Sequence, residues 1–205
     1  MADCQDDGST ADTATSSSSN SSVSNKSSSD ADVAKMLPIR MVSKVIKGFG
    51  RGSADLGIPT ANLCKEEGRF SMSFDSLPTG IYWGFARIGD DTVYKAAVSI
   101  GYNPYYGNET KTIEPHLIAP PHDERRKASS CGETVLREFY GETIRLTVVG
   151  YLRPELPFEG LEKLIEAIKN DIIQAEALGD QTDKVTLAER TWAEGNEAVS
   201  SESAP

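Results

Sequence analysis

Alternating apolar and polar positions predict short β-strands through the middle of the chain. Residues 39–46 alternate as a half-buried strand does. Segments 81–88 and 92–100 are rich in β-branched and aromatic residues, and the turn residues at 89–91 between them predict a hairpin. The expected strands, in chain order, are 39–46, 81–88, 92–100, 112–118 and 143–152.

Other segments of the same region lack such a pattern. Pro115 interrupts segment 112–118, which favours an edge or rim position for that strand. Residues 63–76 are weakly patterned and are expected to form a loop around the sheet. Residues 120–135 contain prolines, a glycine and paired serines, which predicts a solvated, flexible loop. The alternative for its Arg125-Arg126-Lys127 run is that it grips phosphates.

After the last expected strand the hydrophobic period changes to that of a helix. The apolar stripe has charged residues on the opposite face, and Gly179 suits the end of the helix. Short antiparallel strands followed by one helix predict a mainly β fold, a small closed β-barrel covered by a C-terminal helix. Strands and helices do not alternate along the chain, which argues against a doubly wound fold. The stripe consists of Leu161, Leu164, Ile165, Ile168 and Ile172.

The two ends differ from this middle in composition. Residues 1–36 are dominated by Ser, Asp, Ala and Thr and are expected to be disordered, with a phosphorylated regulatory tail as the alternative. Residues 37–179 form the expected folded domain. Residues 180–205 are acidic and polar and are expected to be a flexible tail, unless Trp192 docks on the domain.

Charge and cysteine content restrict the function classes. The net charge of −10 over 205 residues argues against nucleic acid as a partner. Cys4, Cys64 and Cys131 are scattered and fit neither a disulfide framework nor a zinc site, which indicates a reducing compartment. The chain has no apolar run of membrane-spanning length, and its Asp-rich N-terminal residues without an apolar stretch are expected to be neither a secretory signal nor a mitochondrial presequence. A cytoplasmic protein without a membrane partner is expected.

A glycine-alternating stretch follows the first expected strand, at residues 48–53. Such a loop can turn its N–H groups inward, and with Arg51 it suits phosphate. Thr60 and Asn62 are two residues apart, so in extended backbone their oxygens point the same way, and such oxygens suit Mg²⁺. The stretch is neither a Walker A loop nor a dinucleotide fingerprint. A glycine-rich surface turn therefore remains the alternative.

The whole run Gly-Phe-Gly-Arg-Gly-Ser at 48–53 with Gly-Ile-Pro-Thr-Ala-Asn at 57–62 resembles the nucleotide loop of the riboflavin kinase (flavokinase) family. The resemblance extends in the family's order over about residues 42–172. The further motifs are Thr-Gly-Ile-Tyr at 79–82, Val-Ser-Ile-Gly at 98–101, Asn-Pro-Tyr-Tyr at 103–106, Glu-Pro-His at 114–116, Phe-Tyr-Gly at 139–141 and Leu-Arg-Pro-Glu at 152–155.

This resemblance implies a six-stranded Greek-key barrel that transfers the γ-phosphoryl group of ATP to the ribityl 5′-hydroxyl of riboflavin, giving FMN and ADP. It implies Glu114 as the general base, Thr60 and Asn62 as ligands of Mg²⁺ (Zn²⁺ or Mn²⁺ as alternatives), and Arg153 and Phe158 on the flavin side. The implied ATP-binding residues are Gly48, Phe49, Gly50, Arg51, Gly52, Ser53, Pro59, Thr60 and Tyr140.

Plainer roles remain open for several of these residues. Glu114 by itself reads as a solvated charge, Tyr140 as a barrel-core tyrosine and Phe158 as a packing residue. Ala54 stands where eukaryotic relatives often have Lys, and Pro115 where Thr is more usual. A non-catalytic flavin- or nucleotide-binding module is therefore the alternative function.

The segment before the expected barrel is too short to house the FAD synthetase domain that bacterial relatives carry. The resemblance therefore implies a monofunctional, eukaryotic-type kinase that acts as a monomer.

Overall fold

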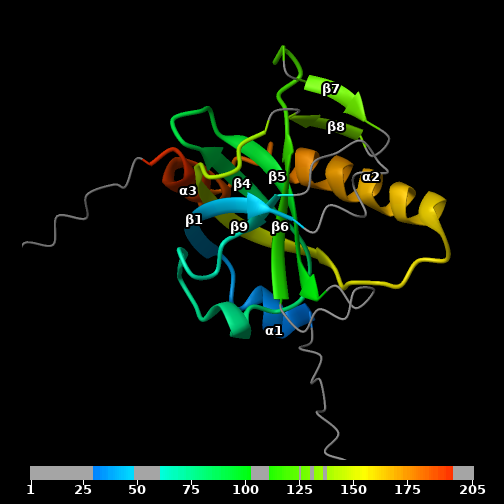
Figure 1. Ribbon diagram of the computed structural model, residues 1–205, viewed down its shortest axis with the longest axis horizontal. Helices are drawn as coiled ribbons and strands as arrows, with labels where there is room; N and C mark the ends of the chain where they lie inside the picture. Colours follow the sequence, from blue (N-terminus) through cyan, green and yellow to red (C-terminus); the bar gives the residue numbers. More distant parts are fainter. Residues whose placement is uncertain are drawn as a thin grey trace, which may run out of the picture.

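The computed structural model describes residues 30–48, 61–102, 111–124, 126–129, 132–135 and 138–195 (Figure 1). Most of the described strands belong to one antiparallel sheet, and helices lie around it. The strands are β1 (Ile39–Lys47), β2 (Ala61–Leu63), β3 (Arg69–Phe70), β4 (Gly80–Ile88), β5 (Tyr94–Tyr102), β6 (Lys111–Ile118), β7 (Arg126–Ser129), β8 (Gly132–Val135) and β9 (Thr143–Arg153). The helices are α1 (Asp30–Ala34), the 3₁₀ turn η1 (Phe74–Ser76), α2 (Leu161–Leu178) and α3 (Lys184–Ala193).

The sheet is a nearly closed antiparallel barrel. Its strand order is β2-β1-β9-β4-β5-β6, with the short β3 paired to β1. Strands β4, β5 and β6 follow one another as hairpins and β9 returns to lie beside β4, which is a Greek-key arrangement. Strand β2 lies beside β6, and we call this closing edge the β2–β6 seam. The predicted mainly β barrel with a C-terminal helix is confirmed.

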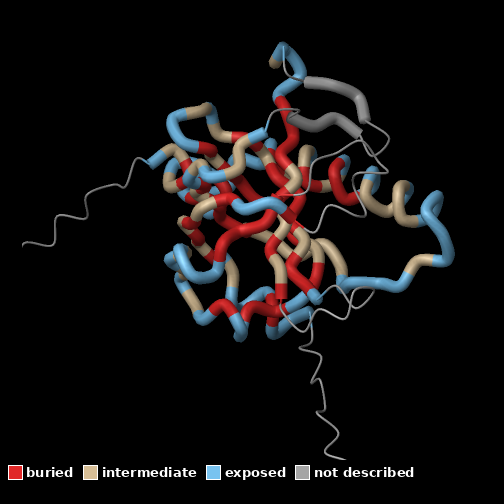
Figure 2. Tube along the Cα trace, viewed as in Figure 1, coloured by how far each residue is buried: buried red, intermediate tan, exposed pale blue. Residues whose placement is uncertain are grey.

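The barrel interior holds the larger of two apolar clusters. Figure 2 shows the strands as mostly buried. Along β1 and β6, buried residues that face the core alternate with half-buried residues on the outer face. The interior is filled by one face of each long strand, including Ile39, Met41, Tyr82, Val98, Ile113, Ile144 and Leu146. The predicted hairpin of 81–88 and 92–100 is confirmed as β4 and β5.

Helix α2 covers the outside of the barrel over β4 and β5. Trp83 and Phe85 on the outer face of β4 pack with Ile172 and Ala175 of the helix, in the second apolar cluster. Strand β4 is therefore buried on both faces. Its Gly84 leaves no room for a side chain, since a Cβ there would overlap the carbonyl oxygen of Thr147 on β9.

Segment 120–135 differs from the expected flexible loop. Strands β7 and β8 form a two-stranded antiparallel sheet, with Arg126 opposite Val135 and Ser129 opposite Gly132. Strand β8 lies near β6 and α2, and Figure 1 shows the hairpin at the end of the barrel away from α1. Polar composition hid this pairing, because a backbone ladder needs no apolar side chains.

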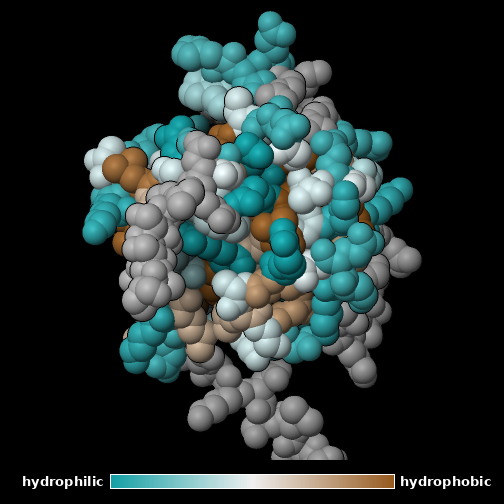
Figure 3. Space-filling model, turned by 90° about the vertical axis from the view of Figure 1, so that its left-hand side faces the viewer, coloured by the Kyte–Doolittle hydropathy of each residue, from teal (hydrophilic) through white to brown (hydrophobic). Residues whose placement is uncertain are grey.

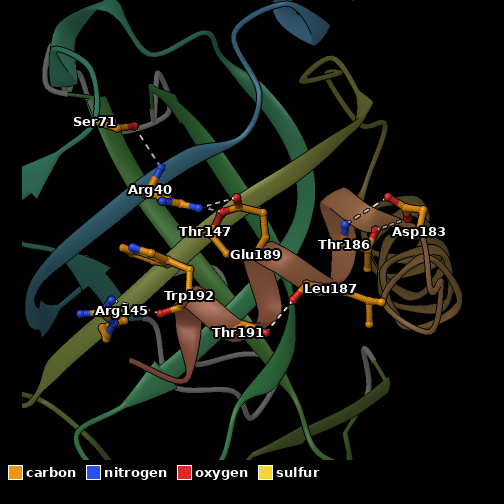
Figure 4. A network of polar contacts seen from close by, with 10 residues as sticks. All are labelled: Arg40, Ser71, Arg145, Thr147, Asp183, Thr186, Leu187, Glu189, Thr191 and Trp192. Carbon is orange, nitrogen blue, oxygen red and sulfur yellow. Dashed lines mark hydrogen bonds and ion pairs between the residues drawn. The ribbon is translucent and has the colours of Figure 1, made fainter. Parts of the chain in front are cut away.

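The expected flexible tail from residue 180 also differs from the structure, which has helix α3 at 184–193. Glu189 accepts hydrogen bonds from Arg40 of β1, at 2.9 Å from Nε and 2.8 Å from Nη2, and one of 2.8 Å from Thr147 of β9. The Trp192 ring has the guanidinium carbons of Arg40 and Arg145 at 5.2 and 4.4 Å from its centroid. Figure 4 shows this network, which docks the helix through polar groups that hydrophobic periodicity cannot reveal.

The structure also has a helix, α1, within residues 1–36, which were expected to be disordered. Val33 in α1 is only 2% exposed and belongs to the barrel core. Seen from the side that carries α3, the described surface is mainly hydrophilic, with apolar atoms in small separate groups (Figure 3). None of the described helices is both long and apolar enough to cross a membrane.

Candidate active site

The β2–β6 seam brings the first half of the candidate site together. Strand β1 ends at Lys47, so Gly48, a predicted ATP-binding residue, lies directly after it. Lys47 pairs with Ala61 and Ile46 with Asn62, so Asn62 lies beside the strand that delivers Gly48. The predicted residues Phe49, Gly50, Arg51, Gly52, Ser53, Pro59 and Thr60 lie outside the described residues.

Asn62 has an amide oxygen that is suited to a ligand. Its neighbours Ala61 and Leu63 belong to the barrel core, so alternation directs Asn62 to the outer face of β2. Asn62 is nevertheless only 4% exposed, and its buried Oδ1 has no hydrogen-bond partner within the described part of the chain. A buried unpaired acceptor costs about 1–3 kcal/mol. A hard cation such as Mg²⁺ would satisfy this oxygen, so the residue fits the predicted metal site.

Among the described residues, no group of three His, Cys, Asp or Glu side chains could hold a metal ion. Amide and hydroxyl oxygens, which the sequence predicts from Asn62 and Thr60, lie outside that class of ligand. Because Mg²⁺ usually keeps several waters and binds phosphate oxygens, a donor set with few protein ligands suits it.

Glu114, the predicted base, projects from β6 on the other side of the seam. Ile113 and Leu117 of the same strand fill the barrel core, so Glu114 points to the outer face. The Thr112 hydroxyl donates a hydrogen bond of 3.3 Å to its Oε1. Because β2 lies beside β6, Asn62 and Glu114 occupy the outer faces of the two strands that close the barrel.

The surroundings of Glu114 favour its protonated form. Burial raises the pKa of its carboxyl above the ordinary value, and the hydrogen bond from Thr112 opposes that shift. A carboxylate that is partly withheld from water is a stronger proton acceptor than a solvated one, which is the property that a general base needs. The plain reading of Glu114 as a solvated charge does not fit this burial.

Tyr140 sits in a turn that is fastened to β1. The Gly141 N–H donates to the Val45 carbonyl at 2.7 Å, and the Val45 N–H donates to the Glu142 carbonyl at 2.9 Å. Gly141 has φ of 81°, which favours glycine in this turn. Tyr140 is half-buried and packs against the barrel core. Its place beside Val45, three residues before Gly48, also keeps it near the start of the predicted nucleotide loop.

Arg153 and Phe158 lie together at the far end of β9. The Arg153 guanidinium carbon is 5.6 Å from the centroid of the Phe158 ring. The same guanidinium makes a two-point ion pair with Asp171 of α2, 2.8 Å from Nε to Oδ1 and 2.6 Å from Nη2 to Oδ2. Asp171 therefore orients Arg153, and Arg153 in turn supports the aromatic ring.

Sequence reasoning missed the residues that hold this site in place. Thr112 could have been found, because it is two residues before Glu114 and a strand puts both on one face. The role of Asp171 could not be predicted, because it occupies one of several polar positions of an amphipathic helix and its partner, Arg153, is 18 residues away. Glu155 lies against Gly101, a contact that its place in the Leu-Arg-Pro-Glu motif does not predict.

The family model and the curated relatives agree on one family. The family described as Flavokinase, riboflavin kinase, matches residues 35–178. A riboflavin kinase of Mus musculus is 41% identical over 157 residues, 75% of this chain and 88% of the mouse protein. One of Homo sapiens is 43% identical over 143 residues, 68% of this chain and 79% of the human protein.

A solved structure is similar in fold. The crystal structure of riboflavin kinase from Trypanosoma brucei has a TM-score of 0.50 with this chain at 21% sequence identity. The match covers 75% of this chain and 83% of the other. At that identity the likeness shows the shared fold.

Proposed function

The chain belongs to the riboflavin kinase family, a family of enzymes that phosphorylate riboflavin to FMN, and on that premise we propose that ATP is its phosphoryl donor. The γ-phosphoryl group of ATP would pass to the ribityl 5′-hydroxyl of riboflavin, giving FMN and ADP. The observation that carries this proposal is the pair of outward-facing groups at the seam, the half-buried Glu114 carboxylate and the Asn62 Oδ1, which has no hydrogen-bond partner among the described residues.

Glu114 is the general base of the proposed reaction. Thr112 occupies Oε1, which leaves Oε2 to accept the proton of the 5′-hydroxyl. As that proton moves to Glu114, the 5′-oxygen attacks the γ-phosphorus, and the bond from that phosphorus to the β–γ bridging oxygen breaks to release ADP. The proton then leaves Glu114 for solvent. Such a base contributes about a hundred- to ten-thousand-fold in rate.

Asn62 and Thr60 are the proposed ligands of Mg²⁺. When bound, the ion would neutralise charge on the phosphate oxygens. The role of Asn62 is to present Oδ1 from a fixed strand, where its pairing through Ile46 holds it beside the end of β1. Gly48 and the following loop would supply backbone N–H groups to the ATP phosphates, with Tyr140 contacting the nucleotide.

Phe158 is the proposed flavin-facing group. With the Arg153 guanidinium near the ring and Asp171 fixing that guanidinium, the aromatic plane is oriented for stacking on the isoalloxazine. Because Asp171 engages Nε and Nη2 of Arg153 and the Pro154 carbonyl accepts a hydrogen bond from Nη1, the contribution of Arg153 to flavin binding comes through the ring that it supports.

A direct assay tests the donor and the product together. Purified protein, riboflavin and Mg²⁺ are incubated with ATP, and FMN and ADP are separated by chromatography. We expect equal amounts of both products, and their loss when ATP or Mg²⁺ is omitted. Riboflavin binding without any FMN would instead identify the chain as a non-catalytic flavin-binding module.

A further inference from the structure

Glu155 lies two residues after β9, and its side chain turns back onto β5. A Cβ placed on Gly101 would overlap Oε1, Cδ and Oε2 of Glu155. Gly101 lies within β5 and is not among the residues with positive φ, so its backbone conformation does not require glycine. The missing side chain at 101 is what makes room for the Glu155 carboxylate.

The contact is polar as well as steric. The backbone N–H of Tyr102, the last residue of β5, is close enough to the Glu155 carboxylate to lower its pKa. The carboxylate therefore bridges the segment 154–160, which carries Phe158, to the end of the β5–β6 pair. The residue just before this segment, Arg153, is attached to α2 by its ion pair with Asp171.

This contact lies on the same face of the sheet as the proposed base. Gly101 is directly opposite Thr112, and Ser99 is directly opposite Glu114. Opposed residues of an antiparallel pair point to one face, and so do residues two apart on one strand. The Glu155 carboxylate thus rests beside Thr112, whose hydroxyl binds Glu114.

The groups around Glu155 confirm this neighbourhood. Partial loss of water and the negative charge of Glu114 raise the pKa of Glu155, whereas Arg153 and the Tyr102 N–H lower it. The Glu155 charge also contributes to the raised pKa of the Tyr82 and Tyr151 hydroxyls, for which burial is the largest cause.

We propose that Glu155 is a positioning residue of the riboflavin side of the site: seated on Gly101, it holds segment 154–160 against the strand face that carries Glu114. This inference rests on the proposed function, because it assigns the ring of Phe158 to the flavin. The Glu155 carboxylate itself contacts protein groups and acts through the segment that it fixes.

The test is a double-mutant cycle in the full chain. The variants are Gly101→Ala, Glu155→Ala and their combination, and the readouts are kcat and the KM values for riboflavin and ATP. Either single change should raise the riboflavin KM roughly tenfold, since a misplacement of about 1 Å is costly. The ATP KM should stay within about twofold, because the proposed nucleotide loop begins at Gly48 on another strand.

Coupling between the two sites decides the outcome. With the carboxylate gone, Gly101→Ala has nothing to displace and should raise the riboflavin KM by less than about threefold. Glu155→Gln keeps an oxygen for the Tyr102 N–H and should stay within about threefold of the parent. The matched control is Glu159→Ala, which removes an exposed carboxylate of the same segment and should change nothing.

Equal costs of Gly101→Ala in both backgrounds would overturn the inference, as would a Glu155→Ala variant that behaves like Glu159→Ala. If Gly101→Ala does not fold, the three position-155 and position-159 variants decide alone. A parent that makes no FMN refutes the proposed function and this inference with it. An active parent with additive effects refutes this inference only.

Discussion

Arg153 and Asp171 form a two-point ion pair that joins the end of β9 to the middle of α2. Both hydrogen bonds are short, 2.8 and 2.6 Å, and Asp171 is nearly inaccessible to solvent, with 5% of its side chain exposed. The pair fixes the direction in which the chain leaves the barrel. It therefore helps to position the segment that carries Phe158, the proposed flavin-facing residue.

Asp171→Asn should destabilise the protein and weaken riboflavin binding together. Leaving Arg153 without its counter-charge costs about 2–4 kcal/mol, somewhat less than for a fully buried pair because Arg153 is partly exposed. Urea denaturation measures the first effect and the riboflavin KM the second. Glu159→Gln breaks an exposed ion pair with Lys163 as the control, and should change the free energy of unfolding by less than about 1 kcal/mol. An Asp171→Asn variant as stable as the control would contradict the assigned role.

Glu189→Gln should destabilise the protein without affecting the reaction. Glu189 is buried and accepts three hydrogen bonds from Arg40 and Thr147, none of which involves a proposed site residue. We expect a loss of about 2–4 kcal/mol in the free energy of unfolding. The riboflavin and ATP KM values should stay within about twofold for the folded variant. Asp32→Asn, which breaks an exposed pair with Lys35, is the control. A large rise in either KM would show that α3 reaches the site.

Asn62→Leu should impair the use of Mg²⁺ without destabilising the protein. The buried Oδ1 of Asn62 has no partner among the residues that the structure describes, so removing this acceptor should leave the free energy of unfolding equal or raise it by up to about 1 kcal/mol. The Mg²⁺ concentration for half-maximal FMN formation should rise at least about tenfold. Asn170→Leu, an exposed change on α2, controls for the added apolar side chain. An unchanged Mg²⁺ requirement would remove Asn62 from the metal site.

Glu114→Gln should change the pH dependence of stability. Burial raises the pKa of Glu114 above its ordinary value of 4.5, so between the two pKa values the folded protein binds more protons than the unfolded chain. The stability that Glu114 contributes is thus complete below the ordinary pKa and is lost as pH rises through the raised one. The variant should therefore need more urea to unfold than the parent at pH 8, and the two should converge near pH 4.

The same urea series on Glu162→Gln, an exposed position on α2, provides the control and should follow the parent at every pH. Parallel curves for the parent and Glu114→Gln would mean that the carboxyl is solvated.

The sequence predicted the barrel because 39–46 has the alternation of a strand, and because 81–88 and 92–100 are rich in β-branched and aromatic residues around a turn. It could not predict α3, since Glu189, Arg40 and Thr147 are distant in sequence and their attraction leaves no apolar stripe. For the candidate site, motif order predicted Glu114 and Asn62, and strand alternation places both outward. The partner of Arg153, Asp171, and the contact of Glu155 with Gly101 are set by tertiary structure that no local spacing encodes.

The role of Glu114 is tested by the rate of FMN formation by Glu114→Gln beside the parent and Glu162→Gln, with riboflavin binding measured by fluorescence quenching. We expect a loss of at least about a hundredfold in kcat for Glu114→Gln, with riboflavin binding within a few-fold of the parent and Glu162→Gln fully active. Turnover that survives the loss of this carboxylate would contradict the assignment of Glu114 as the base.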